Sequence, residues 1–416
     1  MAHPKTLYTY VGVDSHKDTH TAALIDCFFE TLGVISFDNR PSKFEAFLSQ
    51  AEGLKADGTA LMFGLEDASA YGRQLAAFLN GRGHQVRHVT AYLVARERKN
   101  QNITQKSDAG DALCAARVLL SKFGELPSVG PDDRYWTLRA MVTRRDFLVK
   151  NNVALKNYLH NILAARFPRY SDFFSDIFCK SALAFFEGFP SPAALDGVTV
   201  GELAGFLKTP SYGQFGAKKA ADILATVKES GHMDSLFQDA HDGAVRSTIR
   251  QIRYNLQEIE SAEGELAVFL EGFGCTLTSM TGIDTVTAAQ MLSCIGDIRK
   301  FATPAKLARY SGVAPVAYSS GKTDAHYANR RGNRELNSIF YRLAVRLVST
   351  VNPSGKAVNP FFYEYYHRKQ SEGKTKRQAL KCVQRRLVNI IWTMLTRNEE
   401  YVNPPMLVVG RDKGAT

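Results

Sequence analysis

Two carboxylates stand three residues apart near the start of a predicted helix. The segment SDAGDALCAARVLL, residues 107–120, opens with Ser107 and continues with alanines and leucines. Serine favours the N-cap of a helix, and alanine and leucine favour its body. Asp108 and Asp111 would then leave the same helix face in its first turn. The pair either belongs to a cation site or only complements the helix dipole, and other acids upstream favour the first reading.

Two further acids each end a predicted strand. Asp14 follows the stretch 7–13, and Glu66 is the last residue of the stretch 59–66. The expected elements are strands at 7–13, 19–26 and 33–38, a helix at 41–53, a strand at 59–66, a helix at about 70–80, a strand at 84–89 and the helix near 107–120. This order is expected of a mixed α/β sheet flanked by helices.

The placement of these acids resembles that in the RNase H-like fold of RuvC-type nucleases and retroviral-type integrases. In that fold the first and fourth strands are neighbours, so the resemblance implies convergence of four acids: Asp14, Glu66, Asp108 and Asp111. Clustered carboxylates repel one another unless cations lie between them, and Mg²⁺ prefers a few carboxylates and keeps several waters. Two such ions ~4 Å apart can activate an attacking oxygen and stabilise a leaving one. We therefore expect Mg²⁺-dependent phosphodiester cleavage, with two ions per site.

Two histidines lie beside Asp14 in the sequence HKDTH, residues 16–20. On a strand or turn, their spacing does not give the helical HExxH geometry of metalloproteases. We therefore expect His16 and His20 at the surface or in contact with substrate, and not as metal ligands.

The net charge of +11 is concentrated towards the C-terminus. Residues 299–416 hold 22 basic and 7 acidic residues, whereas residues 1–130 hold 14 of each. Tyrosine and phenylalanine are interleaved with the basic residues. A region of this kind indicates a polyanion-binding surface; the alternative is a solvated basic tail that only aids solubility.

The rest of the composition is that of an ordinary soluble protein with two or three domains. The 416 residues contain no apolar run near the ~20 residues of a membrane span, and the N-terminus lacks the plan of a signal peptide. Six cysteines are scattered without a CxxC pair. This pattern favours reduced thiols in the cytoplasm and argues against a zinc site.

Helical patterns dominate from about residue 134. A long helix is expected at about 238–271, with apolar residues at alternating four- and three-residue spacing from Val245 to Leu270. This spacing predicts a coiled-coil seam of about four heptads, whose partner is either a helix of the same domain or a second chain. Residues 279–313 resemble a helix-hairpin-helix in which TGID joins two helices, and such hairpins can contact a phosphate.

A serine pair precedes a basic stretch in a turn-like segment. The segment contains, in order, Ser319, Ser320, Gly321, Lys322, Arg330, Arg331 and Arg334, the last of which opens a predicted helix. A hydroxyl near several guanidiniums is a candidate nucleophile for phosphoryl transfer. On spacing alone, an ordinary loop explains the serines better than a catalytic role does.

Together these motifs resemble one family, the DEDD insertion-sequence transposases, relatives of the Piv DNA invertase. The resemblance covers about residues 8–125 and 275–350 and is carried by VGVDSHKDTH, LEDAS, KSDAGDA, TGID and GVAPVAYSSGK followed by RRGN. It implies a RuvC-like domain whose metal-binding acids are the four named above. It also implies a C-terminal domain in which a serine before a glycine, here Ser320 with Ser319 as its rival, forms a covalent bond to DNA. Some members are guided by a structured RNA that pairs with donor and target DNA.

Four regions follow from these patterns. We expect a RuvC-like DEDD catalytic domain at 1–130, a helical region with the coiled-coil helix at 131–272, a transposase domain with the serine nucleophile at 273–350, and a basic helical extension at 351–416. The expected function is that of an RNA-guided DNA transposase, active as a dimer or tetramer on nucleic acid. Its expected nucleic-acid-binding residues are Lys322, Arg330, Arg331 and Arg334. The alternatives are a RuvC-like endonuclease in which water attacks, and a non-catalytic nucleic-acid-binding protein.

Overall fold

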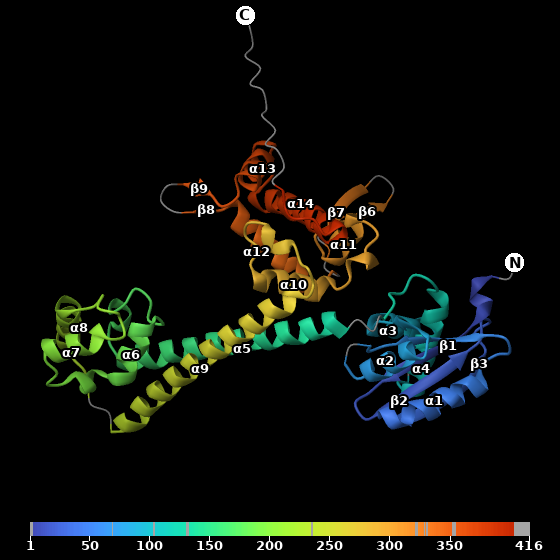
Figure 1. Ribbon diagram of the computed structural model, residues 1–416, viewed down its shortest axis with the longest axis horizontal. Coiled ribbons are helices and arrows are strands. Elements are labelled where there is room, and N and C mark those ends of the chain that lie inside the picture. Colours follow the sequence, from blue (N-terminus) through green and yellow to red (C-terminus); the bar gives the residue numbers. More distant parts are fainter. Residues whose placement is uncertain are drawn as a thin grey trace, which may run out of the picture. The chain divides into compact units, whose positions relative to one another are not determined.

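The computed structural model describes residues 3–68, 70–102, 105–129, 133–233, 236–320, 323–327, 329, 332–351 and 355–402. The chain divides into two compact units, Met1–Trp136 and Thr137–Thr416 (Figure 1). The first holds a mixed sheet and the second is mostly helical. The predicted α/β sheet domain followed by a helical region is therefore confirmed. Within the described part of the chain, no helix is both long enough and apolar enough to cross a membrane.

The first unit is built on a five-stranded sheet with the order β3-β2-β1-β4-β5. Its strands are β1 (Tyr8–Ser15), β2 (Thr19–Ile25), β3 (Thr31–Asp38), β4 (Ala60–Leu65) and β5 (Gln85–His88). Its helices are η1 (Pro4–Leu7), α1 (Pro41–Leu54), α2 (Arg73–Gly81), α3 (Ala91–Asn100) and α4 (Asp108–Ser121). The first and fourth strands are neighbours, and they run parallel. The helix α3 was not predicted, because its sequence is strongly polar and buries only Val94.

The two faces of the sheet carry different layers because side chains alternate along a strand. Val11 of β1 and Phe63 of β4 belong to the core that includes α1 and α2. Tyr10 and Met62, from the same two strands, belong to the core formed with α4. Even-numbered residues of both strands thus face α4. Asp14 continues this series in β1.

A glycine pair lets α4 lie directly on the sheet. Gly12 of β1 pairs with Gly64 of β4. A Cβ at residue 12 would overlap the backbone nitrogen of Ala116 and the backbone oxygen of Ala112, both in α4. A Cβ at residue 64 would press on Leu119 in the same helix. The absence of side chains at these two positions therefore allows the close approach that brings the start of α4 to the end of β1.

The second unit contains two hydrophobic cores. Its longer elements are α5 (Asp133–Arg166), α6 (Lys180–Gly188), α7 (Val200–Lys208), α8 (Ala217–Ser230), α9 (Gln238–Glu271), α10 (Thr285–Ile295), α11 (Pro304–Tyr310), α12 (Arg334–Val348), α13 (Pro360–Ser371) and α14 (Lys376–Arg397). Its short elements are η2 (Tyr170–Asp172), η3 (Pro192–Leu195), η4 (Leu277–Ser279), η5 (Ile298–Lys300), and two hairpins, β6 (Val316–Ser320) with β7 (Thr323–Tyr327) and β8 (Thr350–Val351) with β9 (Lys356–Ala357). One core joins α6, α7 and α8 to parts of α5 and α9. The other joins α10, α11, α12 and α14 to the end of α9.

The long helix α9 has the predicted bounds, but its apolar seam is divided between the two cores. Val245 and Ile249 pack in the first core, and Leu266 and Leu270 in the second. Between them, Leu256 is 39% exposed. Ion pairs from Arg144 to Glu258 and from Arg145 to Glu263 connect α5 to this helix. The two helices lie side by side in Figure 1. The coiled coil itself stays a prediction.

The predicted helix-hairpin-helix takes a different form. TGID, residues 281–284, follows the three-residue turn η4 instead of a full helix, and α10 begins directly after it. The side chain of Asp284 caps α10 by accepting the N–H of Thr287 at 2.8 Å. Because an acidic side chain already occupies this helix start, the expected phosphate contact there is not supported.

The helix α14 is an integral part of the second core. Its residues Val383, Leu387 and Ile391 are fully buried and pack in the same cluster as Phe340 and Leu343 of α12. Polar residues cover its other side. This helix therefore holds its basic side chains in fixed places relative to α12.

Candidate functional site

The pairing of β1 with β4 brings two predicted acids to adjacent strand ends. Val13 pairs with Leu65 in parallel register, and the N–H of Glu66 donates to the carbonyl oxygen of Val13 at 3.2 Å. Asp14 is the next residue of β1 and is buried. The two carboxylates therefore start from neighbouring points of the sheet.

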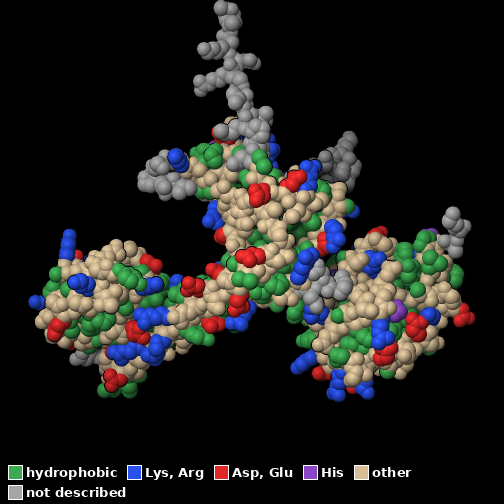
Figure 2. Space-filling model, viewed as in Figure 1, with side chains coloured by type: hydrophobic (Ala, Val, Ile, Leu, Met, Phe, Trp, Pro, Cys, Tyr) green, Lys and Arg blue, Asp and Glu red, His purple; other side chains and the backbone are tan. Residues whose placement is uncertain are grey.

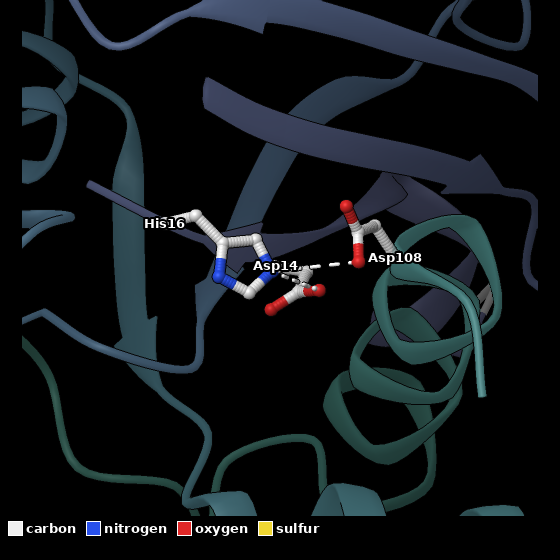
Figure 3. A group of neighbouring side chains, drawn as sticks. All are labelled: Asp14, His16 and Asp108. Carbon is white, nitrogen blue, oxygen red and sulfur yellow. Dashed lines mark hydrogen bonds and ion pairs between the residues drawn. The ribbon is translucent and has the colours of Figure 1, made fainter. Parts of the chain in front are cut away.

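Asp108 reaches the same place from the start of α4. The side chain of Ser107 accepts the N–H of Gly110 at 3.1 Å, which confirms the predicted N-cap. The Nε2 atom of His16 lies 3.1 Å from a carboxylate oxygen of Asp14 and 3.5 Å from one of Asp108. Figure 3 shows the imidazole approaching both carboxylates. The three side chains offer ligand atoms within 4.8 Å of one another, an arrangement that could hold a metal ion.

The two histidines differ from each other in burial. His16 is 48% exposed, but it stands among the potential ligands. His20 is fully buried, with its ring 5.4 Å from that of Phe37 and 6.4 Å from that of Phe44. The expected surface or substrate-contacting position is therefore wrong for His20. The physical reason is that β2 lies between two other strands and is covered on both faces, so nearly all of it is buried.

Asp111 has a protein partner in this structure. One of its carboxylate oxygens accepts a hydrogen bond from Nη1 of Arg98, which comes from α3. Both side chains are largely buried, with exposed fractions of 7% for Asp111 and 24% for Arg98. Asp111 thus lies beside the site, yet its charge is already balanced by a guanidinium.

The electrostatics show that the four acids share one neighbourhood. Burial raises the pKa of Asp14; His16 lowers this pKa, and the charges of Asp108 and Asp111 raise it. Burial likewise raises the pKa of Glu66, with further increases from Asp14 and Asp111. Each carboxylate therefore makes it harder to ionise another, and a cation between them would relieve this repulsion.

The donor set fits a divalent cation. Carboxylate oxygens from Asp14 and Asp108 are hard ligands of the kind that Mg²⁺, Ca²⁺ and Mn²⁺ prefer. Glu66 stands beside them at the end of the neighbouring strand. The imidazole of His16 adds a nitrogen donor, which the softer transition metals prefer.

The serines lie on a hairpin and not in a turn-like segment. Ser319 and Ser320 are the last two residues of β6, and they pair with Asp324 and Thr323 of β7. The backbone of both serines is described, whereas their side chains fall outside the described residues. The same holds for the whole of Gly321, Lys322, Arg330 and Arg331. The hairpin was missed because each of its strands has only five residues.

The base of this hairpin is fixed by two glycines. A Cβ at Gly332 would overlap the backbone of Gly312, so the chain entering β6 touches the chain leaving β7. The N–H of Asn333 donates to the carbonyl oxygen of Tyr310 at 2.7 Å across the same point. Arg334 opens α12, which confirms its predicted position.

The acidic site, formed by Asp14, Glu66, Asp108 and Asp111, has two further neighbours: His16, which the sequence did not indicate as a ligand, and Arg98, which it did not indicate at all. His16 could have been found, because residues 14 and 16 of an extended segment point to the same side. Arg98 gave no comparable signal, since nothing in the sequence RERKN connects it to Asp111.

Comparisons with known proteins place the chain among insertion-element proteins. A family model described as "Transposase", of the DEDD and IS110 type, matches residues 11–168. A second, described as "Transposase IS116/IS110/IS902 family", matches residues 275–359. The chain is 24% identical to an uncharacterized 44.8 kDa protein of insertion element IS116 from Streptomyces clavuligerus, over 95% of this chain and 96% of that protein. It is 24% identical to an uncharacterized 42 kDa protein of IS900 from Mycobacterium paratuberculosis, over 96% and 98% of the two chains. A pilin gene-inverting protein of Moraxella bovis is 30% identical over 30% of this chain and 37% of its own.

Proposed function

Because this chain belongs to the IS116/IS110/IS902 family of transposases, we propose that it is a Mg²⁺-dependent DNA recombinase that moves its own insertion element. We assign its first unit to the RNase H-like fold, an assignment that the neighbouring first and fourth strands support. The observation that carries the proposal is the convergence of Asp14, His16 and Asp108 at a strand end beside Glu66.

In this proposal the acidic site holds two Mg²⁺ ions through the four acids Asp14, Glu66, Asp108 and Asp111. When bound, the ions supply positive charge that stabilises the phosphate during cleavage. His16 keeps the two aspartates in place through its ring nitrogen and can itself be a ligand. Arg98 balances the charge of Asp111 and must release it for that carboxylate to reach an ion.

Ser320 is the proposed nucleophile. Its hydroxyl oxygen forms a bond to the DNA phosphorus, and the bond from phosphorus to the leaving deoxyribose oxygen breaks. The leaving oxygen takes up a proton, and the serine loses its own. Gly321 follows Ser320 directly, so no Cβ hinders the approach of the phosphate. The proposed nucleic-acid-binding residues that follow it in the sequence are Lys322, Arg330, Arg331 and Arg334.

The proposal also includes a guide RNA and an oligomer of the chain. The serines and the acids belong to different units of the chain, so a single active site requires them to meet, within one chain or between two. Recombination cuts and rejoins four strands, whereas one chain carries one acidic site and one candidate serine. We therefore propose a dimer or tetramer on nucleic acid, with a structured guide RNA from the element pairing with donor and target DNA. Light scattering of the active complex at a one-chain mass would contradict the assembly.

The decisive experiment is to trap a covalent protein–DNA adduct. The purified protein, with any RNA that copurifies, is incubated with DNA carrying the element ends and their flanks, in Mg²⁺ or in EDTA. We expect a denaturant-resistant adduct that forms in Mg²⁺ and is absent in EDTA. Cleavage in Mg²⁺ without an adduct would instead identify a nuclease that uses water, for which the acidic site alone is sufficient. Binding with neither cleavage nor adduct would leave the non-catalytic reading.

A further inference from the structure

A basic hollow lies at the base of the β6–β7 hairpin. It encloses about 470 Å³. Its walls come from the hairpin base, from the first turns of α12 and from the start of α14, including Arg334, Tyr341, Arg377 and Lys381. Figure 1 shows the hairpin with α11, α12 and α14 in one part of the second unit.

The three cations of this hollow are Arg334, Arg377 and Lys381. Among the residues that the structure describes, no carboxylate lies within ion-pair distance of Arg334, Arg377 or Lys381, and no Asp or Glu lines the hollow. All three side chains are exposed, and partial desolvation of Lys381, together with the charge of Arg377, lowers the pKa of this lysine. Cations held close together repel one another, and an anion bound between them would relieve this repulsion.

A second hollow of the same unit offers a contrast. It is lined by four cations and four acids, among which Arg139 binds Glu335 and Arg145 binds Glu263 and Asp146. Such a surface is already neutralised and has no unbalanced charge to offer to an anion. The hollow beside the hairpin is therefore the stronger candidate for binding a polyanion.

Two helix starts add to the positive potential. Arg334 is the first residue of α12, and Arg377 is the second of α14. The N-terminal end of a helix carries partial positive charge and favours acids, so cations there cost stability. The first turn of α14 contains no acid, and the one acid in the first turn of α12, Glu335, forms an ion pair with Arg139. Basic residues at both starts indicate that this arrangement serves the binding of an anion, for which helix starts are suited.

The hollow is separated from the serines by the length of the hairpin. The strand β6 has five residues, from Val316 near the base to Ser320 at the far end, which corresponds to about 13 Å between these two residues. A phosphate held in the hollow is therefore not the one that Ser320 attacks. Along a nucleic acid, charged groups recur at intervals of a few ångströms, so one backbone can occupy both places.

We propose that Arg334, Arg377 and Lys381 form a phosphodiester-binding site that holds the nucleic-acid backbone beside the bond to be cut. The choice of a nucleic-acid backbone as the ligand rests on the proposed function, which this site makes more specific. Arg377 and Lys381 lie outside both segments matched by the family models, the second of which ends at residue 359. The site thus gives the basic C-terminal region a defined role, in which Tyr341, 48% exposed, can pack against a sugar or base.

The test compares two double variants that lose the same charge. R377Q/K381Q removes two cations of the hollow, and K374Q/K376Q removes two exposed lysines that precede or open the same helix but do not line the hollow. Binding of the full-length protein to a fluorescent DNA duplex of arbitrary sequence, and to the RNA duplex of the same sequence, is measured over a range of salt concentrations without Mg²⁺. We expect R377Q/K381Q to bind at least about 10-fold more weakly at low salt. We also expect its slope of log K against log salt to fall by about 1 per lost phosphate contact.

The control and a rescue variant keep the result interpretable. K374Q/K376Q should retain the greater part of the wild-type slope, and R377K/K381R, which preserves both charges, should restore it. A loss seen with DNA, with RNA or with both supports the site and identifies the backbone that it holds. Equal losses in the two charge-removing variants, or an unchanged slope in R377Q/K381Q, would overturn it. Adduct formation is scored separately, so an absent adduct in the wild type refutes the serine chemistry and leaves this binding result unaffected.

Discussion

The backbone of Gly12 in β1 lies against the backbone of Ala116 in α4, with no space for a Cβ between them. This contact determines how closely α4 can approach the sheet. Since Asp14 follows Gly12 by two residues and Asp108 opens α4, the same contact determines the separation of the two carboxylates. The acidic site therefore depends on a glycine that carries no functional group.

Gly12→Ala should weaken both the fold and the acidic site. The added methyl group must push α4 away from β1, and we expect a loss of about 3 kcal/mol in the free energy of unfolding, the upper end for overpacking a core. Urea unfolding measures the loss, and the Mg²⁺-induced rise in Tm should become smaller. Gly53→Ala is the control, because its Cβ would meet open space; at this exposed position of α1 it should be neutral or stabilise by up to about 1 kcal/mol. Wild-type behaviour of Gly12→Ala would show that α4 is free to shift.

Asp108→Asn and Glu66→Gln should each abolish DNA cleavage while DNA binding remains. Removal of one carboxylate from a metal site that stabilises the reacting phosphate should cost at least about 100-fold in rate. Cleavage in Mg²⁺ and DNA affinity in EDTA are measured side by side. Glu125→Gln, which changes an exposed acid of the same unit, should cleave normally. Full activity in either site variant would exclude that residue as an essential ligand.

Ser320→Ala should remove the covalent DNA adduct, whereas Ser319→Ala should retain it. The two residues are adjacent in β6, and only Ser320 is followed directly by a glycine, which lets a phosphate approach without a Cβ in the way. Mass spectrometry of the DNA-linked peptide from residues 312–330 identifies the attached residue. An adduct on Ser319 would reverse the assignment, and cleavage without an adduct in the wild type would favour attack by water.

His20 should make the protein less stable in mild acid. Burial lowers the pKa of His20 below its ordinary value of 6.5, and the same holds for His88. The unfolded chain therefore binds more protons than the folded chain as the pH falls below about 6.5, and stability decreases over this range. His20→Phe, which keeps a ring beside Phe37 and Phe44, should reduce this decrease without abolishing it, since His88 remains.

Urea unfolding from pH 8 to pH 5 measures this effect. At pH 8 both histidines are neutral, so a difference between His20→Phe and the wild type reports packing alone. As the pH falls, the free energy of unfolding of His20→Phe should decrease less than that of the wild type. A constant difference across the range would show that His20 does not resist protonation.

Local patterns predicted most elements of the first unit. The strands that end near Asp14 and Glu66 and the helix capped by Ser107 all appear close to the expected bounds. Their signals are local, because apolar stretches, turns and caps depend on a few adjacent residues. The elements that were not predicted, one in each unit, lack such local signals. The helix α3 buries only one side chain, and the strands β6 and β7 are too short to show a period.

The sequence by itself determined which residue types stand at the strand ends and at the helix start, and hence the kind of chemistry they can perform. The tertiary structure alone decided which of them meet. The pairing of β1 with β4 and the contact at Gly12 bring His16 between Asp14 and Asp108, while α3 supplies Arg98 to Asp111. Likewise, packing of α14 against α12 brings Arg377 and Lys381 to Arg334. These contacts join residues far apart in the chain, and they depend on how whole faces pack, which no local pattern encodes.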